Sequence, residues 1–302
     1  MFARNFLVLF YLLGLTNFSH SQNYIGLNVD NDLYFKSDRY YSSGIFVEYG
    51  KLIKKSSDSL SKWNYISRHW TIGQEINTPS IGSTTLISRM DYPYSGWLYL
   101  GYRQEYFQDP DFGYGLGFQI GTTGANESLA KFFQNTYHVN ILKLDPLTWS
   151  VSIPQALHFN INGSFFFGRF LTKKLKWINH NSAQLGSFRN TFKTRVGIQL
   201  GSIPGLPFFG NRLEVLQNGI SFFLGTELEY SLHDYSLTGS WLKDNNPFSL
   251  IPNNFRNKYQ AGFIYQRLPW KANIMLNRSS NYIKNQNYRS HFYLKISLHF
   301  LI

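Results

Sequence analysis

The chain has 302 residues, a formal net charge of +12, 18% aromatic residues and 15% charged residues. Because it contains no cysteine, a disulfide framework, a thiolate nucleophile and a Cys-ligated metal are excluded. The charged fraction lies below the about 25% of ordinary soluble domains, and no apolar run beyond the first residues is long enough for a membrane helix. This composition is typical of a membrane β-barrel, whose lipid-facing and lumen-facing residues alternate.

Residues 1–21 predict a cleaved signal peptide, which leaves residues 22–302 as the mature domain. Arg4 supplies the positive start, residues 6–15 form an apolar core too short to span a bilayer, and small residues precede the cleavage site. An anchoring helix is the alternative, and the short core disfavours it. An exported basic protein seldom meets nucleic acid, so we expect no nucleic-acid partner. The charge then serves either anionic lipid or the solubility of the loops.

Period-2 alternation of apolar and polar residues dominates the rest of the chain. It is clearest at the C-terminus, where Phe292, Leu294, Ile296 and Leu298 share one face of the segment SHFYLKISLHFLI. An even number of such strands predicts an all-β fold, a transmembrane antiparallel barrel of about twelve strands. We expect a monomer. The predicted strands are 23–30, 42–52, 67–76, 93–105, 112–121, 155–169, 187–200, 219–231, 234–243, 256–267, 270–279 and 289–302.

In bacterial outer-membrane barrels the chain starts in the periplasm, periplasmic turns are short and outer loops are long. Residues 233–234 and 268–270 are then short periplasmic turns, and 53–66 an unexplained long one. Trp97 and Tyr99 are expected in the aromatic girdles at the bilayer interfaces. The predicted outer loops are 31–41, 77–92, 122–154, 201–218, 244–255 and 280–288.

The third predicted outer loop contains a short helix within GANESLAKFFQNTYH. Asn126 is its expected N-cap, and Leu129, Phe132 and Phe133 supply an apolar face. Gln134 and His138 stand four positions apart, so they lie on one face of the helix.

Polar side chains gather where these outer loops begin and end. Asn31 and Asp32 end the first strand, Ser42 begins the second, and Gln134 and His138 lie on the helix. Carboxylate, amide and hydroxyl oxygens are the ligands that Ca²⁺ takes, so Asp32 is the expected metal ligand. A lone His without Cys or further His partners suits a general base better than a zinc site.

Other polar residues near this cluster have plainer interpretations. Asp30 and Asp38 are interpreted as solvated turn residues, and Gln74 and Glu75 as members of a hydrogen-bond network facing the lumen. The basic residues Arg39, Arg89 and Lys131 serve either to hold lipid phosphates or as solvated loop charges.

Five segments in series resemble one family, the LpxR-type outer-membrane lipid A 3'-O-deacylases. They are VDNDLYF, DRYYSSG, GQEINTPS, DYPYSGWLYLG and QNTYH followed by Trp149, and they cover about residues 24 to 150. The resemblance implies a twelve-stranded barrel and calcium-dependent hydrolysis of the 3' acyloxyacyl ester of lipid A at the extracellular side of the outer membrane.

The resemblance also assigns roles to single residues. It implies that His138 is the catalytic base, that Asn31, Ser42 and Gln134 belong to the active site, and that Asp32 binds calcium. Ser42 stands where the family has Thr. The family's active-site Lys has no clear counterpart, unless Arg89 replaces its charge. The acidic residue after the catalytic His is missing unless Asp145 serves, and Tyr92 stands where the family has Arg.

Several alternatives stay open at this point. Ser42 or Ser43 with His138 could form a serine lipase, although an Asn-Asp pair favours a cation and water as the nucleophile. A passive pore or adhesin could keep the same scaffold, and an outer-membrane phospholipase could use a related barrel on another lipid.

Overall fold

The computed structural model describes residues 23–302 except 36, 56–62, 204–216, 241–246 and 248–249. The predicted signal peptide, residues 1–21, lies outside the described residues. Within them, twelve antiparallel strands close into one barrel, in which each strand pairs with the next and β1 pairs with β12. The expected fold class is confirmed. The strands are β1 (Asn23–Asn31), β2 (Tyr40–Lys55), β3 (Tyr65–Thr78), β4 (Ser95–Asp109), β5 (Phe112–Thr123), β6 (Leu157–Phe170), β7 (Leu175–Gly186), β8 (Arg189–Gly201), β9 (Gly219–Asp234), β10 (Phe255–Arg267), β11 (Trp270–Ser280) and β12 (Ser290–Leu301).

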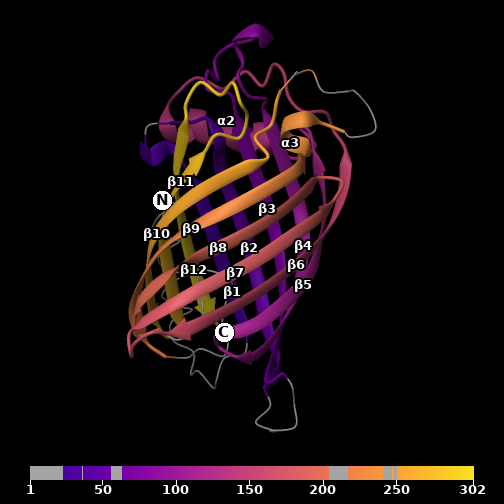
Figure 1. The fold of residues 1–302 in the computed structure, drawn as a ribbon. Coiled ribbons are helices and arrows are strands. Elements are labelled where there is room, and N and C mark those ends of the chain that lie inside the picture. The colour runs from indigo at the N-terminus through magenta and orange to yellow at the C-terminus, as the bar shows by residue number, and fades with distance from the viewer. Residues whose placement is uncertain (1–22, 36, 56–62, 204–216, 241–246, 248–249) are drawn as a thin grey trace.

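Short helices gather at one end of the barrel, which is the upper end in Figure 1 and is called the helix end below. No helix among the described residues is long and apolar enough to cross a membrane. The helices are the 3₁₀ turns η1 (Leu33–Phe35) and η2 (Ile87–Arg89), the α-helix α2 (Ala130–Tyr137), the π-helical segment η3 (His138–Leu142), and the single turn α3 (Tyr235–Thr238).

Alternation along each strand separates a lumen face from an outer face. On β4, Trp97 and Tyr99 point into the lumen, where Trp97 stacks on Phe188 with ring centroids 4.2 Å apart. Leu100 on the same strand faces outward and is exposed. The prediction that Trp97 and Tyr99 form an interface girdle is therefore wrong.

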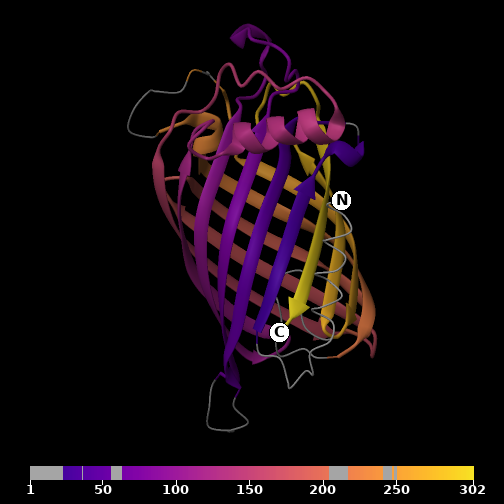
Figure 2. The same ribbon diagram turned by 180° about the vertical axis from the view of Figure 1, so that it is seen from behind.

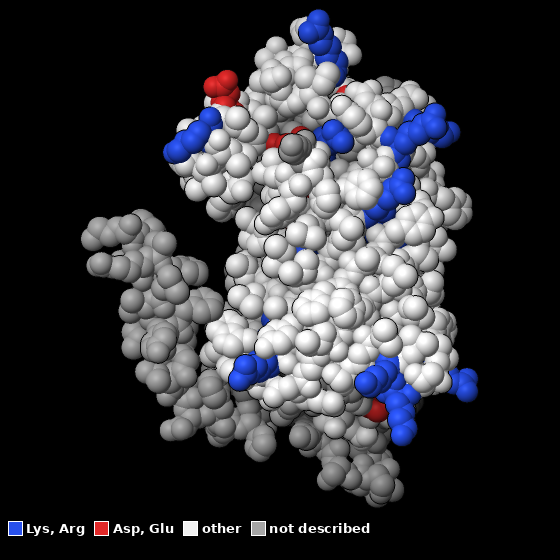
Figure 3. Space-filling model, turned by 90° about the vertical axis from the view of Figure 1, so that its left-hand side faces the viewer, with Lys and Arg blue, Asp and Glu red and all other residues white. Residues whose placement is uncertain are grey.

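One face of the barrel is apolar at its waist and basic near its two ends. On the face shown in Figure 3, Lys and Arg side chains cluster near both ends and the band between them is almost free of charge. Outward-facing Leu27, Val47, Ile72 and Ile120 all lie exposed on the strands. A belt of this kind matches the hydrocarbon core of a bilayer.

Two strand predictions are wrong. One strand was not predicted and another was predicted where the described residues form no separate strand, so the total of twelve strands is unchanged. β7 was missed because polar residues stand on both of its faces, as in Asn179 and His180, so no alternation is visible. The predicted strand 234–243 is instead α3 in its described part, since the Asp234 carboxylate accepts a hydrogen bond from the backbone N–H of Ser236 and starts a helical turn.

Because of these two errors, two connections were assigned to the wrong end of the barrel. Residues 201–218 were expected among the outer loops, but Gly201 lies beside Lys174 at the end opposite the helix end, where its N–H donates to the Lys174 carbonyl at 2.9 Å. Residues 204–216 of this connection lie outside the described residues. Conversely, residues 233–234 are the last of β9 and lie at the helix end.

Candidate active site

Helix α2 is fixed against the outer side of the barrel wall. Trp97 points into the lumen, so its neighbour Gly96 faces outward, and a Cβ at Gly96 would meet the side chains of Ser128 and Ala130. The absence of a side chain at Gly96 thus lets Ala130 approach the strand closely. Figure 2 shows the helix lying across the upper ends of the strands on that side.

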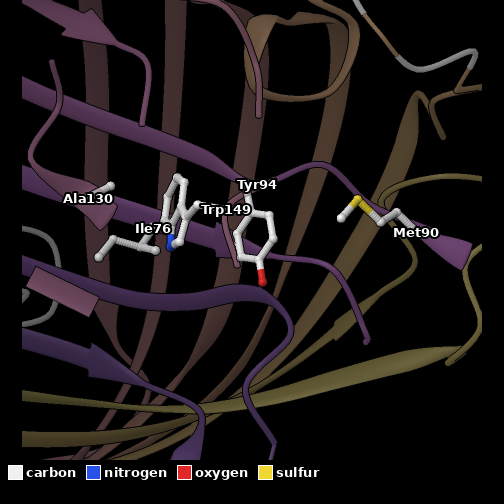
Figure 4. Close-up of a cluster of buried hydrophobic side chains, with 5 residues drawn as sticks. All are labelled: Ile76, Met90, Tyr94, Ala130 and Trp149. Atoms are coloured by element: carbon white, nitrogen blue, oxygen red, sulfur yellow. The ribbon is translucent and has the colours of Figure 1, made fainter. Parts of the chain in front are cut away.

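A small apolar cluster fills the space between α2 and the wall (Figure 4). Ile76 faces outward from β3 and is only 2% exposed, because Ala130 and Trp149 cover it. The Tyr94 and Trp149 rings stack with centroids 4.8 Å apart. This cluster holds the helix and the segment after it in place above β3 and β4. Its members are Ile76, Met90, Tyr94, Ala130 and Trp149.

Gln134 lies on the buried face of α2 and connects three side chains. Its Oε1 accepts a hydrogen bond from Trp149 Nε1 at 2.9 Å. Its Nε2 donates to Thr78 Oγ1 at 2.8 Å and to Asp38 Oδ1 at 3.2 Å. The indole N–H fixes which side of the amide is the acceptor, so Gln134 is held in one orientation.

His138 stands one turn further along and pairs with Asp38. Its Nε2 lies 2.6 Å from Asp38 Oδ2, and the imidazole is buried. The hydrogen bond to the Asp38 carboxylate raises the pKa of His138, burial opposes the shift, and the backbone of Asp145 adds to it. The interpretation of Asp38 as a solvated turn residue is wrong, because Asp38 binds both His138 and Gln134.

Ser42 reaches the site through a β-bulge. Tyr41 pairs with Asn77 and Ser43 with Ile76, so Ser42 is the extra residue of β2. Its hydroxyl accepts a hydrogen bond from Thr78 Oγ1 at 3.1 Å and donates to the Ile76 carbonyl at 3.3 Å. Trp149, Gln134, Thr78 and Ser42 therefore form one continuous chain of hydrogen bonds.

Asp32 lies fully buried in the turn after β1, next to Ser42. Its N–H donates to the Ser42 carbonyl at 3.2 Å. Its Oδ2 accepts hydrogen bonds from Ser37 Oγ at 2.9 Å and from the Arg39 N–H at 3.0 Å. Burial raises the pKa of Asp32 to about 8. Asn31 stabilises the same turn, because its Oδ1 accepts the Leu33 N–H at 2.7 Å.

The donor set around Asp32 fits a calcium ion in one respect. Asp32 Oδ1 is buried and has no hydrogen-bond partner among the described residues, and an orphaned carboxylate oxygen of this kind is costly without a cation. In the described part of the chain, no group of three or more His, Cys, Asp or Glu side chains could hold a metal. A cation here would therefore depend on carbonyl and hydroxyl oxygens or water besides Asp32, which calcium accepts.

Backbone strain surrounds the same place. The described non-glycine residues with positive φ are Tyr40, Leu129, Lys143 and Trp149, with φ between 47° and 59°. Tyr40 begins β2, Leu129 precedes α2, Lys143 ends η3, and Trp149 binds Gln134. Such conformations cost of order 1–3 kcal/mol each and cluster at functional sites.

The structure brings most of the predicted site residues to one place at the helix end. Asn31, Asp32, Ser42, Gln134 and His138 lie on adjoining elements, linked by the contacts described above. Glu75 lies apart in the lumen, with its Oε2 2.8 Å from Arg189 Nη1. Arg89 and Asp145 are exposed.

Sequence reasoning missed Asp38 and Thr78. Both stand inside segments that were singled out, but nothing in those segments distinguishes them from neighbouring polar residues. Their partners are Gln134 of α2 and His138 of η3, and His138 lies 100 residues after Asp38, so only the fold reveals them.

Comparison with known proteins agrees with this architecture. The family model described as outer membrane protein LpxR matches residues 6–300. Among solved structures, LpxR from Salmonella typhimurium superposes with a TM-score of 0.74 at 17% identity, covering 92% of this chain and 100% of that one.

The beta domain of the Bordetella autotransporter BrkA has a TM-score of 0.49 at 8% identity, over 93% of this chain and 99% of its own, which is too low to carry an argument. No curated protein matches the sequence. The family match spans nearly the whole chain, and the barrel found here is the fold of the Salmonella protein. The chain therefore belongs to the LpxR family of outer membrane proteins.

Proposed function

We propose that this protein is a lipid A deacylase of the outer membrane that hydrolyses the 3' acyloxyacyl ester of its substrate. The observation that carries the proposal is the position of the His138 network, which lies on the outer side of the barrel wall under α2 and not in the lumen. An ester in a membrane lipid approaches a barrel from that side. The family membership and the resemblance of the five segments support the choice of lipid A.

The helix end is proposed to face outside the cell. The connections at the opposite end include residues 110–111, 171–174 and 268–269, which are short, as periplasmic turns are. The longest connection, residues 124–156, lies at the helix end, whereas two further connections at the opposite end, residues 56–64 and 202–218, are longer than these turns. On this orientation the site meets the leaflet that contains lipid A.

His138 is proposed as the general base. It takes a proton from a water molecule, whose oxygen attacks the ester carbonyl, and the proton then passes to the alcohol oxygen as the acyl bond breaks. Asp38 holds the imidazole in one orientation and stabilises the imidazolium that forms, because a carboxylate 2.6 Å from Nε2 favours the charged ring. Gln134 positions Asp38 through its Nε2, and Asn31 stabilises the turn that carries Asp32.

Asp32 is proposed to hold a calcium ion through its Oδ1, which has no hydrogen-bond partner among the described residues. When bound, such an ion supplies positive charge that stabilises the negative charge developing on the ester oxygen. Ser42 supports the turn that carries Asp32, through its carbonyl and the bond from the Asp32 N–H.

Water is a better nucleophile here than Ser42. A catalytic serine hydroxyl donates its hydrogen bond to the base, whereas the Ser42 hydroxyl donates to the Ile76 carbonyl. This geometry argues against a serine lipase.

The proposal is tested by mass spectrometry of lipid A and phospholipid from cells that express the wild type, His138→Ala or Asn140→Ala. The wild type should release the acyloxyacyl group, and loss of the base should slow release by about 10²–10⁴-fold. Asn140 is exposed on the adjoining segment, so Asn140→Ala should behave as the wild type.

Other outcomes separate the alternatives. Release of acyl groups from phospholipid alone would identify a phospholipase. Unchanged lipids together with ion conductance in planar bilayers would identify a pore. Equal activity of wild type and His138→Ala would remove His138 from the mechanism.

The calcium proposal predicts saturable heat of Ca²⁺ binding in titration calorimetry of the purified mature protein. Asp32→Asn should abolish that heat, because the neutral amide lacks the charge that the ion requires. Asp109→Asn, an exposed carboxylate on β4, is the matched control. Full hydrolytic activity in excess chelator would contradict the role assigned to Asp32.

A further inference from the structure

The exposed surface of α2 carries large apolar side chains. Ala130, Gln134 and His138 occupy its buried face. Phe132 lies opposite Gln134 and is 63% exposed, while Phe133 and Tyr137 flank the buried face and are each 41% exposed. The following π-helical segment adds Val139 and Ile141, which is 64% exposed. Large side chains so exposed along one short stretch mark a contact surface, here called the outer helix face and defined by these five residues.

This surface continues the apolar belt of the barrel. Under α2, outward-facing Ile76 on β3 pairs with Gly96 on β4. Two and four residues further along β4 stand Leu98 and the exposed Leu100, and Leu100 pairs with the exposed Ile72. Four strand residues span about 13 Å, so the helix lies directly beside the surface that faces the hydrocarbon core.

The charges of the helix agree with a position at the edge of a bilayer. Across α2 and η3, residues 130–142, the single formal charge belongs to Lys131, and the next charged residue is the exposed Lys143. Amphipathic helices that lie in a membrane interface combine an aromatic and aliphatic face with basic residues, which attract anionic headgroups.

We propose that α2 and η3 lie in the membrane interface, with the outer helix face inserted among the acyl chains of the surrounding leaflet. The occupant of this surface is bilayer lipid, and neither a second copy of the chain nor a water-soluble protein. The buried face of the same helix carries Gln134 and His138, so the bilayer contact sets the level of these two side chains relative to the lipid.

The inference does not require the proposed enzymatic function. It rests on the outer-membrane location, on the position of α2 outside the wall and on the exposure of its apolar side chains. The experiment therefore measures position in the bilayer and not hydrolysis, so that one proposal can fail while the other stands.

Spin labelling gives a direct test, because the chain has no cysteine and each introduced thiol is unique. Phe132→Cys, Ile120→Cys and Glu127→Cys are labelled with a nitroxide in the mature protein, in vesicles of phosphatidylethanolamine and phosphatidylglycerol. Ile120 is an exposed belt residue of β5, and Glu127 is an exposed polar residue just before α2. Power saturation compares collisions with oxygen, which enters the bilayer, and with a water-soluble nickel chelate.

The label at position 132 should resemble that at position 120, with a ratio of oxygen to nickel collisions severalfold above that at position 127. A ratio at position 132 equal to that at position 127 would overturn the proposal, since the outer helix face would then lie in water. Dipolar broadening at position 132 that disappears on dilution with unlabelled protein would overturn it in favour of a second copy. Since all three positions are exposed, the barrel should fold in each variant, and faster migration without heating in SDS gels checks this.

Discussion

His138 and Asp38 form the tightest contact between a titratable pair in the site, and the pH dependence of hydrolysis should report it. The pair raises the pKa of His138 above the ordinary value near 6.5. A general base must be neutral, so activity should fall as pH drops through the raised pKa. Asp38→Asn removes the charge, which should move this acid limb to lower pH and lower the plateau by about 10²-fold or more.

The measurement is a pH–rate profile of both proteins on vesicle-borne lipid A. The shift of the limb separates a positioning role for Asp38 from a purely structural one, which would lower the rate at every pH alike. Asp145→Asn serves as the control, because its carboxylate is exposed and only its backbone acts on His138. If the acid limb of the pH–rate profile is unchanged in Asp38→Asn, the Asp38 carboxylate does not set the pKa of His138.

Ser42 offers a second test at the level of a single side chain. Ser42→Thr keeps the hydroxyl that binds Thr78 and the Ile76 carbonyl, and it adds a methyl group at a site that is 2% exposed. Overpacking of this size costs about 1–3 kcal/mol of stability, while activity should survive. Release of acyl groups by Ser42→Thr, compared with wild type and Ser42→Ala, is the readout. Complete loss in a folded Ser42→Thr barrel would favour a serine nucleophile.

The sequence pointed to candidate residues that the structure brings close together, but not to their partners. Asn31, Asp32, Gln134 and His138 were visible because polar residues interrupt an apolar alternation or recur at helical spacing. Asp38 and Thr78 were not, because their importance lies in hydrogen bonds to α2 and η3, far away in the chain. The bulge at Ser42 was also invisible, since a bulge is defined by the register of two strands and not by one segment.

At the scale of secondary structure, the close packing of α2 on β4 makes Gly96 a sensitive position. Gly96→Val would drive a side chain into Ser128 and Ala130 and push the helix, with Gln134 and His138, away from the wall. Displacement of a catalytic group by about 1 Å can cost about 10²-fold in rate. We expect such a loss of lipid A hydrolysis in a barrel that remains folded.

Gly101 provides the matched control on the same strand. A Cβ there would have its nearest neighbour at 3.4 Å, on the Tyr99 ring, so Gly101→Ala should keep both fold and activity. Hydrolysis is measured beside far-ultraviolet circular dichroism. Full activity of Gly96→Val would mean that the helix position tolerates movement.

Strand prediction succeeded where one face of a strand is apolar and the other polar. β12 and β10 follow that rule and were located within a few residues. β7 breaks it, because Asn179 and Asn181 share the outer face with Trp177. Alternation also misled at residues 234–243, where the cap formed by Asp234 starts a helical turn.

For the whole molecule, the lumen contains charged pairs, some between strands that are distant in the sequence and some between neighbouring strands. Arg189 on β8 binds Glu75 on β3, and Lys258 on β10 binds Glu227 on β9 at 3.1 Å. A cavity of about 460 Å³ lies in the lumen, with Glu75 in its lining. The ion pairs of the interior join different strands of the wall, while the chemistry proposed here belongs to the outside of that wall. No sequence pattern predicts which residues belong to the lumen and which to the outside of the wall, because this depends on closure of the barrel between β1 and β12.

The attachment of α2 to the outside of the barrel has a kinetic consequence. A lipid that meets His138 there arrives by diffusion within the membrane plane. The rate of encounter therefore depends on the surface density of the lipid in the membrane and not on its bulk concentration. Initial velocity in proteoliposomes should therefore rise with the mole fraction of lipid A and stay constant when inert vesicles are added. A velocity that instead follows total lipid A per millilitre would mean that the substrate leaves the membrane before it is cut.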